Sequence, residues 1–178
     1  MTETKYQQAQ RIAEQGQLTE ALALLEEHLH EHPDDPEALN DIAAVLHCLN
    51  RSHEAIGYLY RARRQRPDDP KIIWNLAEVL IAESLVDEAR LLFNSLEKAG
   101  ILSFDLLNRT ARLLLDQGRA QEGLELLQWS QRLCPEQTRL DTIIESVRMH
   151  IHRPKTTIES VLTESNKTAA EPIGVAHL

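Results

Sequence analysis

The chain has 178 residues, enough for one domain of ordinary size, and 42% of them are hydrophobic although only 4% are aromatic. A core of that kind consists mostly of Leu, Ile and Ala, which suits packed helices better than a β-sandwich, and the plentiful Leu, Ala, Glu, Gln and Arg are good helix formers. The formal charge of −9 argues against nonspecific binding to nucleic acid or to an anionic membrane, because both need clustered positive charge.

The sequence is built from units of 34 residues, which span residues 2–35, 36–69, 70–103 and 104–137 without an insertion. Each unit contains two helical patterns joined by a short break. The eighth position of the units is always small, and the eleventh and twenty-fourth are always bulky. In unit order these positions hold Ala9, Ala43, Ala77 and Ala111, then Ile12, Leu46, Leu80 and Leu114, then Leu25, Leu59, Phe93 and Leu127. Small side chains let two helices approach closely while bulky ones fill the surrounding space, so each unit is predicted to be a packed helix pair.

Capping and turn residues mark the predicted helix boundaries. Asp35 and Asp69 each precede a proline, so each is expected to cap a helix whose first residue is that proline. Ser103 can take the same role in the fourth unit. The fifteenth position of the units favours a left-handed turn between the two helices. It holds Gly16, Asn50, Ser84 and Gly118, of which serine is the weakest member.

Residues 138–152 continue the pattern as one further helix. Its apolar stripe consists of Leu140, Ile143, Ile144, Val147 and Ile151. Glu145 stands at the eighth position, so we expect no second helix to pack closely, and we interpret this helix as a cap for the array. Pro154 should end it. We predict that the Thr- and Ser-rich residues 153–178 form a mostly disordered tail. The alternative is one or two amphipathic turns around Ile158, Val161 and Leu162.

The four units resemble the tetratricopeptide repeat (TPR) family over residues 2–137. The resemblance rests on agreement at the small, bulky and turn positions together, in four units that share one strict register. It implies an all-α fold, a right-handed α-solenoid of antiparallel helix pairs, the TPR superhelix, with a concave groove. The predicted TPR domain therefore covers residues 2–152, with residues 138–152 as its capping helix.

Two further features bear on where the protein works. Cys48 and Cys134 lie far apart and lack a metal-binding spacing, so we expect two reduced thiols. The polar N-terminus has no apolar segment of the kind found in signal peptides, and no stretch approaches the ~20 apolar residues of a membrane-spanning helix. We therefore predict a cytoplasmic protein without membrane insertion.

The sequence offers little for catalysis or metal binding. His28 and His32 would share a helical face, but His30 would not, and no third ligand is evident. The same run also ends a predicted helix, where partly cationic side chains suit the helix dipole. No nucleophile–base pair, Gly-rich phosphate loop or constellation of carboxylates stands out. We predict no metal, no cofactor and no catalytic residue, and thus a protein that is not an enzyme.

A basic cluster ends the second unit and consists of Arg61, Arg63, Arg64 and Arg66. One interpretation is a solvated face whose charges match those of the acidic first unit. The other is a convex docking patch for an acidic partner. We favour the first, and the second stays open.

The concave groove is the main candidate for a functional site. The resemblance implies that the first helix of each unit lines it, mainly through its second, fifth, sixth, ninth, twelfth and thirteenth residues. The predicted partner-binding residues are Asn40, Asp41, Ala44, His47, Lys71, Trp74, Asn75, Glu78, Asn108, Arg109 and Arg112. Trp74 is the most informative, because Ile73 beside it already fills the core position. We expect the tryptophan to point into the groove, the alternative being sideways packing on a neighbouring first helix.

One binding mode of the family can be compared directly. The carboxylate clamp for chaperone C-termini uses Lys, Asn, Asn, Lys and Arg over three successive units. In the second to fourth units those positions hold Asn40, Ala44, Asn75, Asp105 and Arg109. Only Asn75 and Arg109 agree, so this clamp is not predicted. Together with Arg112, these two residues could still hold an anionic or amide-rich ligand.

Three hypotheses for function follow. The first is an adaptor that binds a peptide or helix of a protein partner in the groove. The second is a structural scaffold that assembles with itself through its ends or convex face. The third, which rests on family analogy alone, is an accessory subunit or chaperone for a bacterial glycosyltransferase or secretion system. The sequence does not identify the partner.

Overall fold

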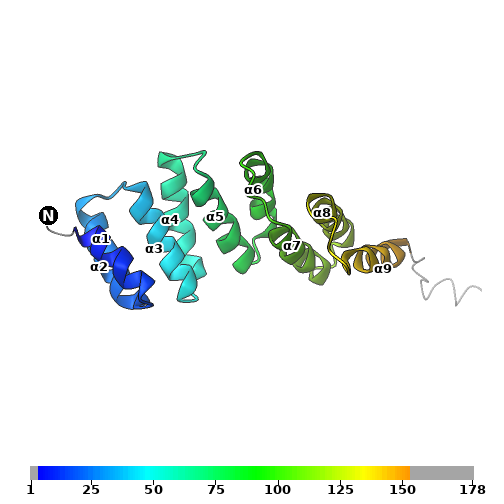
Figure 1. The fold of residues 1–178 in the computed structure, drawn as a ribbon, viewed down its shortest axis with the longest axis horizontal. Helices are drawn as coiled ribbons and strands as arrows, with labels where there is room; N and C mark the ends of the chain where they lie inside the picture. Colours follow the sequence, from blue (N-terminus) through cyan, green and yellow to red (C-terminus); the bar gives the residue numbers. More distant parts are fainter. Residues whose placement is uncertain (1–3, 153–178) are drawn as a thin grey trace, which may run out of the picture.

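The computed structural model describes residues 4–152, and over this range it consists of nine helices and no strand. In Figure 1 the helices follow one another in a row, with α1 at one end and α9 at the other. Their bounds are α1 (Lys5–Glu14), α2 (Leu18–Glu31), α3 (Pro36–Cys48), α4 (Ser52–Gln65), α5 (Pro70–Ala82), α6 (Val86–Lys98), α7 (Phe104–Asp116), α8 (Ala120–Leu133) and α9 (Leu140–His152). The all-α solenoid predicted from the sequence is confirmed.

The predicted helix caps are present. The Asp35 carboxylate accepts hydrogen bonds from the backbone N–H groups of Glu37 and Ala38, at 3.0 and 3.3 Å. Asp69 caps α5 in the same way, and the Ser103 hydroxyl accepts from the backbone N–H of Leu106 at 3.1 Å. Each cap satisfies N–H groups that have no partner within the helix, which is why α3, α5 and α7 begin where they do.

The turns inside the pairs adopt the left-handed backbone that the sequence predicts. Asn50 and Ser84 have φ angles of 59° and 60°, and Gly16 and Gly118 have 81° and 75°. A left-handed conformation strains a serine by about 1 kcal/mol, whereas glycine adopts it freely. Ser84 therefore marks a local strain at the turn of the third pair.

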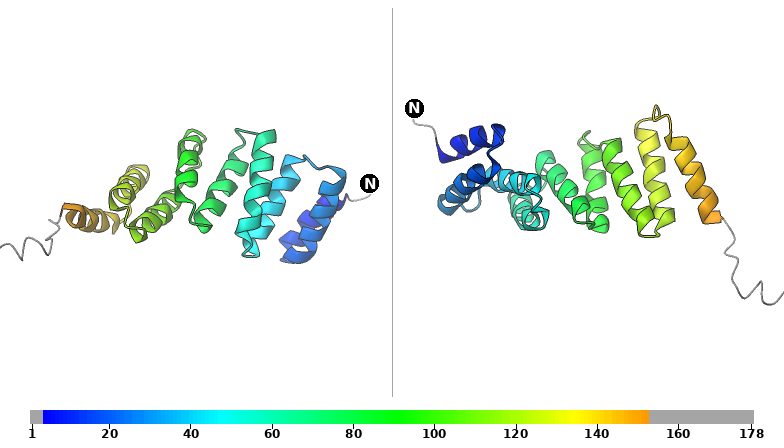
Figure 2. Two further views of the ribbon diagram at one scale, coloured as in Figure 1. Left: turned by 180° about the vertical axis from the view of Figure 1, so that it is seen from behind. Right: turned by 90° about the horizontal axis from the view of Figure 1, so that it is seen from below.

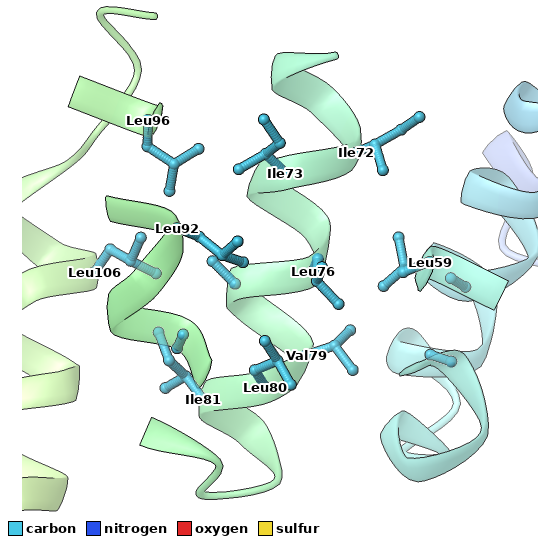
Figure 3. Close-up of a cluster of buried hydrophobic side chains, with 14 of the residues drawn as sticks. Leu59, Ile72, Ile73, Leu76, Val79, Leu80, Ile81, Leu92, Leu96 and Leu106 are labelled. Atoms are coloured by element: carbon cyan, nitrogen blue, oxygen red, sulfur yellow. The ribbon is translucent and has the colours of Figure 1, made fainter. Parts of the chain in front are cut away.

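Close packing inside each pair follows from the small residues of the eighth position. Ala9, Ala43, Ala77 and Ala111 are all fully buried. In the fourth pair the approach is closer still, because a Cβ added at Gly123 would lie 2.9 Å from the Cδ2 atom of Leu115. Figure 3 shows the result around α5, where side chains from α4, α6 and α7 surround those of the helix. The core is thus a continuous row of leucine, isoleucine and alanine side chains.

The first helices of the pairs form a layer of their own. Besides its partner helix, α5 contacts both α3 and α7. The two views of Figure 2 show the pairs stacked side by side along one axis, with α9 packed against α8 at the end of the row. We call this layer of first helices the inner layer, and the predicted groove residues all lie on it, on α3, α5 and α7.

The helix α9 differs from the earlier first helices in its exposure. Leu140 and Ile144 are buried, whereas Ile143, predicted on the same apolar stripe, is 46% exposed. Glu145 lies in solvent and forms an ion pair with Arg148 at 3.1 Å. The predicted tail 153–178 lies outside the described residues. No helix in the part of the chain that is described has the length and apolarity needed to cross a membrane.

Candidate functional site: the concave groove

Asp41 is the centre of a polar cluster that joins three successive repeats. Its carboxylate accepts hydrogen bonds from the Tyr6 hydroxyl at 2.7 Å and the Gln10 amide at 3.3 Å, both on α1. The ammonium group of Lys71 on α5 donates to the same carboxylate at 2.9 Å. Only 17% of the Asp41 side chain is exposed. Burial, together with the neighbouring Asp41 carboxylate, raises the pKa of Tyr6 far above its ordinary value, so the phenol remains a donor at every physiological pH.

A second contact joins the amides of two predicted groove residues. The amide nitrogen of Asn75 donates to the side-chain oxygen of Asn40 at 2.9 Å. Asn40 is 2% exposed and lies beneath the surface rather than on it. A buried amide needs partners for its polar atoms, so this hydrogen bond fixes the register between α3 and α5.

A third contact joins α5 and α7. The guanidinium of Arg109 donates to Glu78 at 2.5 Å and pairs with Asp105 at 3.0 Å. Only 18% of the Glu78 side chain is exposed. The hydrogen bond to Glu78 raises the pKa of Arg109, and partial burial works in the opposite direction. Arg109 is therefore held by its own chain before any ligand arrives.

These contacts follow one rule of the repeat. The fifth residue of one unit meets the sixth residue of the next, in the pairs Tyr6–Asp41 and Asn40–Asn75. Trp74 and Arg109 occupy the same two positions one unit later, although Arg109 turns to Glu78. Trp74 is partly exposed and packs against the hydrophobic core. Trp74 therefore neither points fully into the groove nor packs fully against neighbouring residues.

The remaining predicted groove residues do not join this cluster. The His47 ring hydrogen-bonds through Nδ1 to the Ser52 hydroxyl at 2.8 Å, at the turn between α3 and α4. Ala44 borders a small hollow of about 260 Å³ between α1 and α3. Asn108 and Arg112 border a larger hollow of about 480 Å³ between α7 and α9.

Two groups of residues on this surface are absent from the predicted partner-binding set. Tyr6 and Gln10 lie at the fifth and ninth positions of the first unit, where the same register points to them. Arg139 and Ile143 border the larger hollow and occupy the second and sixth positions of a fifth unit. Treating residues 138–152 only as a cap concealed these two residues, although the 34-residue register reaches them.

The histidine run and the basic cluster serve local contacts. The rings of His28 and His32 lie 4.8 Å apart, as predicted for a shared face, and His28 Nε2 hydrogen-bonds to the capping Asp35 at 2.8 Å. Despite the opposing effect of burial, this bond and those from backbone N–H groups lower the pKa of Asp35. Within residues 4–152 no group of three side chains is arranged to hold a metal. Arg61 donates to the Pro33 carbonyl at 2.5 Å, and Arg66 to Glu37 at 3.0 Å.

Comparison with known families identifies the repeats. The tetratricopeptide repeat model matches residues 6–70 and 49–103, which together make up more than half of the chain. The chain belongs to the tetratricopeptide repeat family. The resemblance inferred from the 34-residue register is thereby confirmed, and the register also includes residues 104–137, beyond the matched segments. None of the curated proteins compared is significantly similar to this TPR protein in sequence.

Several solved structures share the fold of this TPR protein. MamA of Desulfovibrio magneticus RS-1 is 19% identical, with a TM-score of 0.69 over 96% of this chain and 99% of that one. MamA of strain AMB-1 is 16% identical, with a TM-score of 0.70 over 95% and 92%. YrrB, described as a TPR protein with an unusual peptide-binding site, is 18% identical, with a TM-score of 0.68 over 79% and 73%. At these identities the likeness establishes the architecture.

Proposed function

We propose that this TPR protein is a non-enzymatic, cytoplasmic adaptor that binds an extended peptide or a helix of a protein partner in its concave groove. The observation that carries the proposal is the inner layer itself. Polar and aromatic side chains from α1, α3, α5 and α7 share one surface, and two hollows of about 260 and 480 Å³ open between the first helices. Protein ligands are commonly held by such a combination of apolar hollows and a few convergent polar groups.

The proposed contact residues divide by exposure into direct and supporting ones. Lys71, Trp74 and Arg109 are at least partly exposed and could touch a ligand directly. Asn40 is buried, so it would act by orienting Asn75. The full proposed contact set is Asn40, Asp41, Ala44, His47, Lys71, Trp74, Asn75, Glu78, Asn108, Arg109 and Arg112.

Site-specific photo-crosslinking in the native host tests the groove. A benzophenone amino acid is placed at position 71 or 74 on α5, a first helix. The matched control carries the same amino acid in place of the exposed Arg64 on α4, a second helix. The proposal expects one protein adduct from the two groove positions and none from position 64. Mass spectrometry of the adduct identifies the bound segment. Adducts from position 64 alone would move the binding surface to the basic cluster.

A scaffold that assembles with itself is the second candidate function, because two large apolar side chains are highly exposed on the surface. Leu91 on α6 is 79% exposed and Met149 on α9 is 68% exposed. Exposed apolar groups of this size are a feature of interaction surfaces when they are part of a patch. Light scattering across a concentration series separates the two functions, since a monomer at all concentrations supports the adaptor and large species that grow with concentration support the scaffold.

A further inference from the structure

The hollow between α7 and α9 has an apolar floor and an open rim. Leu127 and Leu140 beneath it are only 4% and 5% exposed, and Leu115 adds a further aliphatic wall. Ile143 at the rim is 46% exposed, so its side chain offers apolar surface to whatever enters. A volume of about 480 Å³ accommodates a large aliphatic side chain together with the backbone beside it.

Two arginines at the rim of this hollow lack an acidic partner. Arg112 on α7 and Arg139 before α9 are both exposed, and neither forms an ion pair with another described residue. Of the acids near these residues in sequence, Asp105 pairs with Arg109 and Glu145 with Arg148, and Asp141 accepts a hydrogen bond from Gln131. Asp116, four residues after Arg112, forms no ion pair with either arginine. The residues that line the hollow therefore include two arginines and no carboxylate, on a chain whose net charge is −9.

Asn108 supplies a second observation at the same place. Its amide nitrogen donates to Gln137 at 2.7 Å, but its side-chain oxygen is buried and accepts no hydrogen bond from a described residue. A buried acceptor without a donor is unfavourable, so it marks a position where an N–H group of a ligand can supply the missing hydrogen bond.

We infer that this hollow is the specificity site of the groove and that it binds an acidic, aliphatic peptide segment of the protein partner. A Leu, Ile or Met side chain of the partner enters the hollow. A carboxylate next to it in the sequence pairs with Arg112 and Arg139, and charge complementarity selects this occupant over a basic or neutral one. This inference deepens the proposed function and rests on it, because it names the chemistry that the groove recognises.

A titration with a short probe peptide tests the assignment. The full-length, ¹⁵N-labelled protein is titrated with acetyl-Glu-Leu-Glu-amide, and amide shifts are followed by NMR. We expect saturable shifts confined to α7, residues 137–139 and the first half of α9, with smaller ones near Leu127. Matched peptides with the sequences Lys-Leu-Lys and Glu-Ser-Glu isolate the roles of charge and of the aliphatic side chain, and each should bind at least ~10-fold more weakly.

Protein variants complete the test. Arg112→Glu with Arg139→Glu should weaken binding of the probe at least ~10-fold, and Arg112→Gln with Arg139→Gln should weaken it less. Arg64→Glu, a charge reversal at the exposed arginine of α4, is the control and should leave affinity unchanged. Neither rim arginine makes an ion pair, so circular dichroism of these variants should match the wild type.

Three results would overturn the inference. Shifts centred on α3 and α5, or equal affinity for Glu-Leu-Glu and Lys-Leu-Lys, would remove the hollow as the specificity site. Tighter binding by ~10-fold after deletion of 153–178 would mean that the chain's own segment, which includes Ile158, Glu159 and Leu162, occupies the hollow. These failures differ from that of the proposed function, because photo-crosslinking at positions 71 and 74 would still return a partner.

Discussion

The middle of the groove and its C-terminal end use the same kinds of residue for different purposes. In the middle, Asp41 holds Tyr6, Gln10 and Lys71, and Glu78 holds Arg109. At the C-terminal end, Arg112 and Arg139 face a hollow without an acidic partner. The sixth position of the register holds the acceptor Asp41 in the middle but Ile143 on α9, so α9 offers Arg112 an aliphatic side chain instead of a carboxylate.

This comparison separates two roles that a groove residue can have. A polar side chain already paired across two repeats stabilises the stacking of those repeats, and binding a ligand there must replace an existing contact. A charged side chain without a partner has no such contact to lose. Substitutions in the middle should therefore reduce stability more than affinity, whereas substitutions at the C-terminal end should do the reverse.

Deletion of residues 138–178 should have the largest effect. Removing α9 takes away the buried side chains of Leu140 and Ile144 and exposes Leu127 beneath them. Loss of two buried aliphatic side chains corresponds to about 3–6 kcal/mol of unfolding free energy. Urea denaturation followed by circular dichroism measures the loss. Deletion of 153–178 alone is the control, and equal midpoints for the two truncations would refute a distinct stabilising role of α9.

Ala77→Leu should destabilise the middle of the array by overpacking the core between α5 and α6. Ala77 is fully buried where α5 meets α6, so the three extra carbon atoms of a leucine cannot be accommodated without displacing neighbouring atoms. Overpacking of this kind costs about 1–3 kcal/mol. Ala82→Leu, at the exposed end of the same helix, is the matched control and should leave the thermal midpoint unchanged. An unchanged midpoint for Ala77→Leu would place the core elsewhere.

Asp41→Ala should destabilise the middle of the groove through lost hydrogen bonds. Tyr6 and Gln10 lose their acceptor, and the partly buried phenol keeps only the hydrogen bond that it accepts from the Gln10 amide. The expected cost is about 1–2 kcal/mol in urea unfolding. Asp105→Ala, whose side chain is 67% exposed, controls for removing a carboxylate and should cost much less. Equal effects would mean that the Asp41 cluster contributes no more than an ordinary surface pair.

Arg109→Ala and Arg112→Ala compare a paired arginine with an unpaired one, three residues apart on α7. Arg109 pairs with the largely buried Glu78, but 45% of its own side chain is exposed, so solvent screening limits the loss to about 0.5–1 kcal/mol. Arg112 forms no ion pair with a described residue, and its removal should not change the unfolding midpoint. If Arg112→Ala destabilises the protein as much as Arg109→Ala, the distinction between paired and free groove residues fails.

The repeat architecture was predictable because it depends on local chemistry. Alanine at the eighth position, aspartate before proline and a left-handed turn at the fifteenth position each act within one helix pair. The groove was predictable only in part. The sequence placed Asp41 and Lys71 on one surface, but the contact between them depends on how far α3 and α5 turn relative to each other. Trp74 likewise packs partly on the core, and its register position alone does not determine how much of the ring faces the groove.

The C-terminal hollow was missed for a different reason. Glu145 at the small-residue position predicted a helix without a second helix, and this led to a capping role for the whole element. That reasoning concerned only the face of α9 that a following helix would cover. Ile143 on α9 and Arg139 just before the helix lie on the side that borders the hollow. A cap and a binding surface can thus be two faces of one helix.

Calorimetry on the partner segment identified by photo-crosslinking tests the central claim most directly. The segment is titrated into the wild type, into Arg112→Glu with Arg139→Glu, and into Lys71→Ala with Arg109→Ala, each first checked for fold by circular dichroism. The account predicts that the first pair of substitutions weakens binding by about 1.4 kcal/mol or more, a tenfold loss, while the second pair changes affinity by less than half of that. A loss of affinity confined to the second pair would contradict it and place recognition in the middle of the groove.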